Sequence, residues 1–389
     1  MNPRDNVAER LNRVYPRLLD LSHRIHRHPE TGFEEVNAAA WLAGMLQDEG
    51  FHVEVGICGL PTAFAARAGN GPLNIAICAE YDALPGIGHA CGHNIIAAAA
   101  AGAGIAAAAA ADDVGLTVTV IGTPAEELGD AGGKILLLER GAFEGVHAAM
   151  MVHPAPFDVL TPRIIAASMF EIRYTGKEAH ASAFPEMGIN AADAMTIAQT
   201  SIGLLRQHIL PTDRIHGIIT HGGDAPNIVP AFTSARFIVR SQTIEQLEQL
   251  RPRVYRCFEA GAIGSGAKLE IIGGDKPYSE MLHDREIAAV FRRNAELLGR
   301  NFPNVEGAAE RAAASTDMGN VSKTIPSIHP MIGIDSLPAV NHQREFTNHC
   351  ITEAADKAVY DGALAMAWTA TDLASDPAAR NRLNPGFLP

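Results

Sequence analysis

A loop in the first quarter of the chain gathers side chains that commonly bind metal ions. Residues 79–94 read AEYDALPGIGHACGHN. They continue from residues 73–80, which have the pattern of a buried strand and overlap the loop by two residues. Cys91 and His93 lie two positions apart in a glycine-rich turn. A thiolate and a neutral imidazole are both good ligands for zinc-like divalent ions. The pair alone also fits a packed cysteine beside a hydrogen-bonded histidine, so it does not decide between the two.

Similar side chains follow two further predicted strands. Residues 116–122 lead into TPAEELGDAGG, which contains Glu126 and Glu127, and residues 147–152 lead into His153. Ligand sites of open parallel sheets lie at the carboxyl ends of the strands. Three consecutive strand ends bearing Cys, His and paired Glu therefore favour a metal site over the polar loops that any sheet carries.

The adjacent carboxylates Glu126 and Glu127 suggest a division of labour, with one as a metal ligand and the other as a proton acceptor. Neighbouring side chains of an extended chain point in opposite directions, so both reach one site only if the loop bends. Pro124 and the glycines after Leu128 favour such a bend. A solvated acidic loop is the alternative.

Further histidines are candidates to complete the site. His153 precedes a proline, which keeps it extended, and a purely structural histidine fits that position as well. Far downstream, His342 lies in AVNHQREF and His349 follows it closely. Sequence spacing does not choose between His342 and His349.

The predicted elements indicate an α/β fold with a mostly parallel central sheet and helices on both faces. From residue 167 the pattern changes to strand, helix, two strands, helix and strand, which indicates a separate α+β module. We therefore expect three segments: 1–166 and 279–389 form one domain, and 167–278 form an inserted one. The alanine-rich residues 95–111 are shorter than the ~20 that a membrane span needs and predict a buried, closely packed helix.

Composition narrows the class of protein. The 389 residues are 47% hydrophobic and 19% charged, as in soluble globular proteins. The formal net charge of −13 and the lack of a basic stripe argue against nucleic-acid binding. The charged N-terminal stretch lacks the features of a secretory signal, and five cysteines without paired spacing fit a reducing compartment. We expect a cytoplasmic protein without membrane association.

Several motifs in order resemble the co-catalytic metallopeptidases, a family that includes aminoacylases, carboxypeptidase G, hippurate hydrolase and the indole-acetyl-amino-acid hydrolases. Besides AEYDALPGIGHACGHN, they are RIHRHPETGFEE, TPAEELGDAGGK, MVHP, GKEAHASAFPEMGINAADA, HGGDAPNIVPAF, STDMGNVS and NHQREF. They extend over nearly the whole chain. The branch with aminobenzoyl-glutamate hydrolase and β-alanyl-lysine-type dipeptidase looks most similar.

The resemblance implies a role for individual residues. The ligands of two divalent ions correspond to Cys91, His93, Glu127, His153 and His342. Glu126 matches the general base, and Asp82 an acid that orients a ligand. In the inserted domain His180 matches a histidine that polarises the scissile carbonyl, often from the partner subunit of a dimer, while Asn227 and Arg240 match substrate contacts. This chain has Glu80 where other branches carry histidine, and those branches have aspartate near the Cys91–His93 turn, so the ion that each group binds stays open.

The resulting hypothesis is a metal-dependent amidohydrolase that cleaves an N-acyl or N-aroyl amino acid or a small dipeptide. The inserted domain would then act as a lid and form a homodimer. A non-catalytic ligand-binding or assembly protein of the same fold is the alternative, and loss of Glu126 or a ligand would favour it. A structural zinc site would need closed four-ligand spacing, which is absent from the sequence. Arg236 and Lys177 are alternatives to Arg240, and the metal stays open among zinc, manganese, cobalt and nickel.

Overall fold

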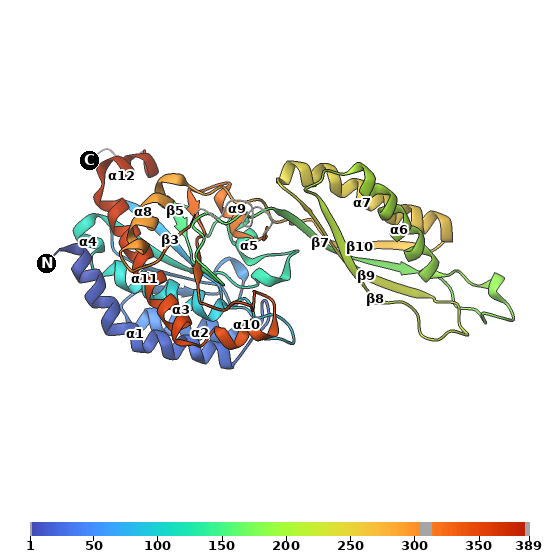
Figure 1. Cartoon of the computed structure of the whole chain (residues 1–389), viewed down its shortest axis with the longest axis horizontal. Coiled ribbons are helices and arrows are strands. Elements are labelled where there is room, and N and C mark those ends of the chain that lie inside the picture. Colours follow the sequence, from blue (N-terminus) through green and yellow to red (C-terminus); the bar gives the residue numbers. More distant parts are fainter. Residues whose placement is uncertain (1, 304–312, 386–389) are drawn as a thin grey trace. The chain divides into compact units, whose positions relative to one another are not determined.

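The computed structural model describes residues 2–303 and 313–385. It divides into two compact units, each with its own core. Unit 1 comprises residues 1–128, 132–163 and 281–389, and unit 2 comprises residues 164–280 together with 129–131 (Figure 1). The inserted α+β module expected from the sequence thus corresponds to a unit that begins at Ile164 and ends at Glu280.

Unit 1 is built on a six-stranded sheet in the order β1-β2-β4-β3-β5-β11. The strands are β1 (His52–Val55), β2 (Phe64–Ala68), β3 (Leu73–Ala79), β4 (Leu116–Gly122), β5 (Ala148–Met150) and β11 (Ser327–Ile328). β4, β3, β5 and β11 are parallel, whereas β1 and β2 add antiparallel strands at one edge. These two were not predicted, because β1 is short and largely exposed and β2 is rich in alanine.

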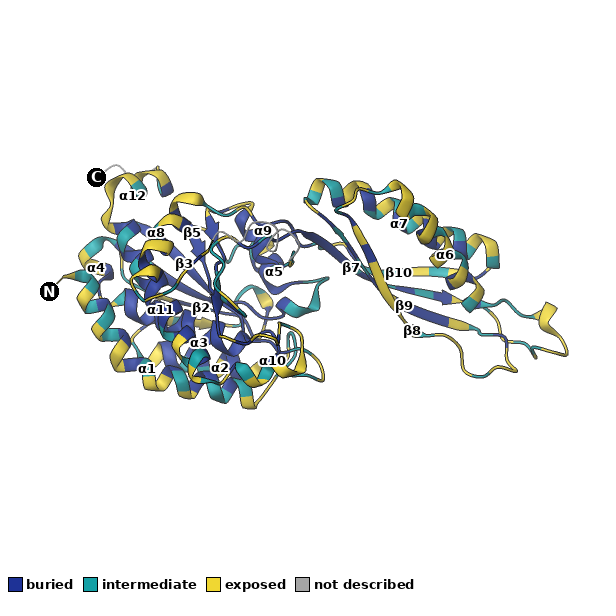
Figure 2. Ribbon diagram, in the orientation of Figure 1, coloured by how far each residue is buried: buried dark blue, intermediate teal, exposed yellow. Residues whose placement is uncertain are grey.

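Helices cover this sheet. They are α1 (Pro3–Arg27), α2 (Val36–Asp48), α3 (His93–Ala108), α4 (Ala111–Val114), α5 (Gly133–Glu139), α8 (Arg285–Glu296), α9 (Met318–Ser322), α10 (Arg344–His349), α11 (Glu353–Ser375) and α12 (Pro377–Leu383). α1, α3 and α11 pack together, and α3 lies against β3 and β4. α5 and α9 pack against each other, and Lys134 of α5 reaches Glu80 at the end of β3. β3 is accordingly buried along most of its length (Figure 2), and β4 has the same burial pattern.

α3 is the buried alanine-rich helix expected from the sequence. Its residues His93 to Ala107 are all buried, and its glycines lie where a side chain would collide with a neighbour. A Cβ at Gly104 would be 2.3 Å from Val120 Cγ2 on β4. Among the described residues, no helix is both long and apolar enough to cross a bilayer.

Unit 2 folds as strand, helix, two strands, helix and strand. The elements are β7 (Ala166–Thr175), α6 (Ala191–Leu205), β8 (Arg214–His221), β9 (Phe232–Ser241), α7 (Ile244–Ser265) and β10 (Lys268–Gly273). The antiparallel sheet has the order β10-β7-β9-β8, and α6 and α7 contact β7 and β9. Alternate residues of β9, Ala235, Phe237 and Val239, enter the core of this unit. β8 is an edge strand, and most of its residues are exposed.

We predict that Gly104→Ala destabilises unit 1, because the new methyl group overlaps Val120 in a packed core. Such overpacking costs about 1–3 kcal/mol. Gly44→Ala in α2 is the control, since a Cβ there meets no atom within 4 Å and alanine in a helix is favoured by about 0.5–1 kcal/mol. Thermal unfolding measures both. Equal or higher stability of Gly104→Ala would contradict the close packing of α3 on β4.

Candidate metal centre

The carboxyl ends of β3 and β4 bring two of the predicted loops together. Ala79 of β3 pairs with Gly122 of β4, so the segments that follow start side by side. Gly92 then turns the chain with a left-handed φ of 77°, and α3 begins at His93. A Cβ at Gly92 would be 2.5 Å from Pro154, so only glycine lets the Cys91 turn approach the His153–Pro154 segment.

The bend required for Glu126 and Glu127 is present. Ala125 has φ 61°, a left-handed value that is costly for a residue with a side chain. The buried Glu35 carboxylate accepts a hydrogen bond from the Ala125 N–H at 2.8 Å, and the chain then enters a short 3-10 helix, Glu126–Leu128. In this geometry both carboxylates approach the same imidazole, with Glu126 Oε2 4.0 Å and Glu127 Oε1 3.8 Å from His93 Nε2.

The predicted end of the strand over residues 147–152 is wrong. β5 stops at Met150, and His153 begins a separate short strand, β6 (His153–Ala155), which pairs in parallel with β12 (Met331–Gly333). The chain changes sheets here, which the sequence pattern did not reveal. Nδ1 of His153 lies 2.8 Å from its acceptor, Pro154 O, so the other ring nitrogen, Nε2, is available, 3.5 Å from Cys91 Sγ.

His342, and not His349, approaches the loop. The His342 N–H donates to Ala90 O at 2.9 Å, and the ring nitrogen Nε2 lies 3.4 Å from Cys91 Sγ and 3.6 Å from Glu127 Oε1. His342 itself has a positive φ of 69°. His349 ends α10 and belongs to none of the clusters of ligand-type side chains in the described part of the chain.

Three overlapping clusters of ligand atoms result, with the atoms of each cluster within 4.8 Å of one another. They are Cys91, His93 and His153; Cys91, Glu127 and His342; and Glu80, His93 and Glu126. Two donors bound at about 2.1 Å to one tetrahedral ion are separated by ~3.4 Å, and a sulfur–nitrogen pair by slightly more. Cys91 Sγ lies 3.4 Å from His342 Nε2, and His93 Nε2 lies 3.5 Å from Glu80 Oε2. These distances fit pairs of donors that share a cation.

Asp82 fixes the orientation of His93. Its Oδ1 lies 2.9 Å from His93 Nδ1, and its Oδ2 accepts the Glu127 N–H at 2.9 Å. Because an ionised carboxylate cannot donate, the proton of a neutral imidazole lies on Nδ1. The lone pair of Nε2 then faces carboxylate oxygens, which also carry only lone pairs. Burial lowers the pKa of His93, but the charge of Asp82 and its hydrogen bond outweigh burial and raise it well above its usual range. These groups therefore favour a positive charge, which a second ring proton or a bound cation can supply.

Burial opposes the charged form of every group in the cluster, but at His93 the charge of Asp82 outweighs it and raises the pKa, and at Glu80 the charge of Lys134 outweighs it and lowers the pKa. Burial lowers the pKa of His153 to about 4, which keeps the imidazole neutral and able to donate its lone pair. It also raises the pKa of the Cys91 thiol well above its usual range, an effect that a bound cation opposes. The pKa of Glu126 is raised well above normal by burial and then by the charges of Glu80 and Glu127.

The residues present fit a pair of divalent ions. His93 Nε2, Glu80 Oε2 and Glu127 Oε1 are buried and make no hydrogen bond within the described ranges. Buried polar atoms without partners are rare in folded proteins, and an ion is one of the accepted explanations. Mixed sulfur, nitrogen and oxygen donors suit zinc and similar transition metals better than magnesium or calcium.

The predicted substrate-contact residues lie at two different ends of unit 2. The exposed His180 forms a bridge with Ile228, and Ala181 N donates to Asn227 O at 3.0 Å, so His180 and Asn227 belong to neighbouring segments. Arg240 lies near the other end of β9, where it pairs with Ala167 of β7. That end also carries the hydrogen bonds between Ala167 and Tyr278, which lie close in sequence to Ile164 and Glu280, where the long segment of unit 2 begins and ends.

Comparison with known proteins identifies the family. Residues 166–264 match the family described as a peptidase dimerisation domain. The Xaa-Arg dipeptidases of Mus musculus and Homo sapiens are 36% and 35% identical, aligning with 96% and 95% of this chain and with 89% and 88% of their own lengths. The chain belongs to the M20 peptidase family. It is accordingly a hydrolase of peptide or amide bonds, as the sequence predicted.

Solved structures agree with the M20 fold. The aminobenzoyl-glutamate utilization protein of Klebsiella pneumoniae has a TM-score of 0.71 at 18% identity, covering 93% of this chain and 97% of that one. A dinuclear metal-binding peptidase of the M20 family from Bacillus subtilis has a TM-score of 0.62 at 22% identity, covering 91% and 98%. The predicted α/β fold with its inserted domain is confirmed.

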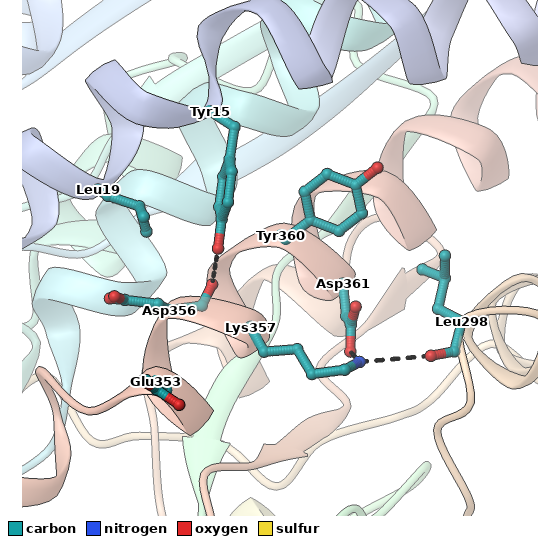
Figure 3. A pocket seen from close by; sticks show the side chains of 8 residues that line it. All are labelled: Tyr15, Leu19, Leu298, Glu353, Asp356, Lys357, Tyr360 and Asp361. Atoms are coloured by element: carbon teal, nitrogen blue, oxygen red, sulfur yellow. Dashed lines mark hydrogen bonds and ion pairs between the residues drawn. The ribbon is translucent and has the colours of Figure 1, made fainter.

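A pocket of about 500 Å³ elsewhere in unit 1 of this M20 protein is lined by residues of α1 and α11 together with Leu298 (Figure 3). Several of its polar groups are already engaged. Tyr15 donates to Asp356 O at 2.9 Å, the Asp356 carboxylate lies 2.7 Å from His23, and Lys357 contacts Asp361. None of the predicted site residues lines it.

Sequence reasoning missed the part that Glu80 and Lys134 play in the cluster. The sequence identifies Glu80 only as a departure from related branches, and it assigns no role to Lys134 of the TPAEELGDAGGK motif. Both are 0% exposed, and their side chains are 2.5 Å apart. The alternation along β3 offered a signal, because Ala76, Cys78 and Glu80 lie opposite the residues that face α3, on a side that must be covered by some other element.

We predict that Cys91→Ala lowers the metal content, because its sulfur belongs to two of the three ligand clusters. Loss of even a supporting group costs about 10–100-fold in metal affinity, and loss of a shared donor should cost at least that much. Metal analysis after dialysis against a limiting concentration of Zn²⁺ measures the effect. Cys257→Ala, a buried cysteine of unit 2, is the matched control and should retain wild-type metal content. Equal metal content in both variants would contradict the assignment.

Proposed function

We propose that this protein is a metal-dependent amidohydrolase that cleaves the amide bond of a small dipeptide or an N-acyl or N-aroyl amino acid. The single observation that supports it best is the convergence of Cys91, His93, Glu127, His153 and His342, with a Glu126 carboxylate oxygen 4.0 Å from His93 Nε2. The names of the Xaa-Arg dipeptidases, which match over nearly the whole chain, support a dipeptide among these substrates.

The five ligand side chains would hold two divalent ions, which supply Lewis acidity to a water molecule and to the amide carbonyl. Glu126 is the general base. It accepts a proton from the attacking water as the oxygen adds to the carbonyl carbon, and it delivers this proton to the amine nitrogen as the C–N bond breaks.

His180 is the candidate for holding the carbonyl oxygen. Its Nδ1 accepts hydrogen bonds from the N–H groups of Ser182 and Ala183, each at 3.3 Å. The proton of the neutral ring therefore lies on Nε2, which can donate to a developing oxyanion. Asn227, on the adjacent segment, is the candidate for a further substrate contact.

His180 and Arg240 of one chain are too far apart to hold one small substrate. Arg240 lies eight residues beyond Phe232, the first residue of β9. That span corresponds to ~27 Å of strand, and the His180–Asn227 pair lies beyond Phe232. If both residues bind substrate, they come from two subunits. We therefore propose that His180 and Asn227 act in the active site of the partner subunit. Arg240 would bind the carboxylate of the substrate in the active site of its own subunit.

The same unit supplies a surface for the homodimer. β8 is an edge strand, and Ile218 and Ile219 on it are 67% and 48% exposed. Exposed apolar side chains on an open strand edge favour pairing with another chain. The match of this unit to a peptidase dimerisation domain supports a second copy of the same chain as the partner.

We predict that Glu126→Gln lowers kcat by about 10²–10⁴-fold, the usual contribution of a general base. Gln has nearly the same shape but cannot accept the proton. Metal content should stay at the wild-type value, since Glu126 is not one of the five proposed ligands. Steady-state kinetics with a dipeptide panel, combined with metal analysis of the same preparations, checks both parts. Near-normal turnover in the metal-loaded variant would refute the base assignment.

We predict that Ile218→Asp shifts the protein from dimer to monomer, because a buried interface cannot accommodate an unpaired carboxylate. Ile263→Asp is the control, since Ile263 is 84% exposed on α7 of the same unit. Light scattering after size-exclusion chromatography gives the molar mass of each variant. A dimeric Ile218→Asp protein would exclude the β8 edge as the interface.

We predict that inactive Glu126→Gln and His180→Ala subunits restore activity when they are coexpressed with different tags and purified as a mixed dimer. One site of that dimer combines an intact Glu126 with the intact His180 of the partner subunit. If His180 acts within its own chain, each site lacks one group and the mixed dimer stays inactive. The two homodimers are the controls.

A further inference from the structure

Glu80 has a buried carboxylate whose two oxygens differ in their hydrogen bonding. Oε1 accepts a hydrogen bond from Lys134 Nζ at 2.5 Å. Oε2 makes no hydrogen bond to any residue that the structure describes, and the whole residue is 0% exposed. Leaving a charged oxygen buried without a partner is costly, so such an atom indicates an ion or a function.

Lys134 also binds Asp317, and here both oxygens are satisfied. Asp317 Oδ1 accepts from Lys134 Nζ at 2.7 Å, and Oδ2 accepts from the Lys134 backbone N–H at 2.8 Å. All three side chains are fully buried. Lys134 is therefore anchored at two points by Asp317, and it holds Glu80 by one oxygen only. The remaining oxygen of Glu80 is fixed in place without being used.

That oxygen lies 3.5 Å from His93 Nε2. In the neutral ring, which is the form that binds a metal, the hydrogen bond from Nδ1 to Asp82 leaves Nε2 with a lone pair. Nε2 and Glu80 Oε2 are then both acceptors and cannot bond to each other. Their separation is close to the ~3.4 Å expected for two donors on one tetrahedral ion. Glu126 belongs to the same cluster of ligand atoms, which extends the centre away from Cys91.

We infer that Glu80 Oε2 is a further ligand of the cation that His93 binds, and that Lys134 is the positioning residue that presents it. The inference rests on the metal centre of the proposed function and extends its ligand set beyond the five side chains named there. It also explains the buried lysine. Lys134 binds Asp317 and one oxygen of Glu80, and it leaves the other oxygen of Glu80 to the metal.

The test compares two substitutions, each of which removes one of the two negative charges that Lys134 contacts. Glu80→Gln keeps an oxygen that can accept from Lys134 but replaces the anionic donor, whereas Asp317→Asn leaves Glu80 intact. Metal-free proteins are titrated with Co²⁺. Calorimetry measures the affinity for each ion, and the visible absorption bands report its coordination. We expect Glu80→Gln to bind one of two ions about 10–100-fold more weakly, with altered bands. Asp317→Asn should keep the wild-type affinities and bands.

Glu80→Asp provides a second variant if Glu80→Gln does not fold. It keeps the charge beside Lys134 but is shorter by one methylene, so it should also lose affinity for one ion. Wild-type Co²⁺ binding by either Glu80 variant overturns the inference, and so do equal losses in Glu80→Gln and Asp317→Asn, which would indicate charge balance alone. These results leave the proposed function intact if the wild-type protein binds two ions. A wild-type protein that binds fewer would refute the metal centre itself.

Discussion

Concentrated negative charge in a buried place is the constraint on which the rest of this site depends. The groups that contribute it are Glu80, Asp82, Glu126 and Glu127, and Cys91 adds a further negative charge when its thiol loses the proton to bind a metal. Burial opposes the ionisation of each group, and each charge opposes the others. Lys134 supplies one positive charge. Such a cluster costs more folding free energy than a single lysine can return, and bound cations would offset that cost.

The fold bears this cost by fixing the acidic groups before any ion arrives. Parallel strands β3 and β4 start the loops at one edge, and Glu35 holds the strained Ala125 that aims Glu126 and Glu127. Asp82 ties the two loops together, since it contacts both His93 and the backbone of Glu127. Ligands that are already oriented lose little conformational freedom on binding, which favours tight and specific coordination.

Much of this arrangement follows from residue types and strand ends. Cys91, His93, Glu127 and His153 could be placed at one edge because parallel strands deliver their loops there. His342 could not be distinguished from His349, since the approach depends on a positive φ and on one backbone hydrogen bond to Ala90. The departure of His153 into a second sheet was missed for a related reason: it depends on pairing with β12, almost two hundred residues away in the sequence.

If His180 and Arg240 both bind substrate, the distance between His180 and Arg240 of β9 connects assembly with catalysis. An enzyme for small substrates gains little from a second domain unless that domain contributes to the site or controls access to it. Here one end of unit 2 continues into unit 1, while the other presents an imidazole whose free N–H is already defined by its backbone contacts. If the partner subunit uses that imidazole, a monomer can bind metal and still lack the donor for the oxyanion. Dimerisation would then be a condition for turnover and not merely for stability, because the dimer interface would supply part of the transition-state stabilisation.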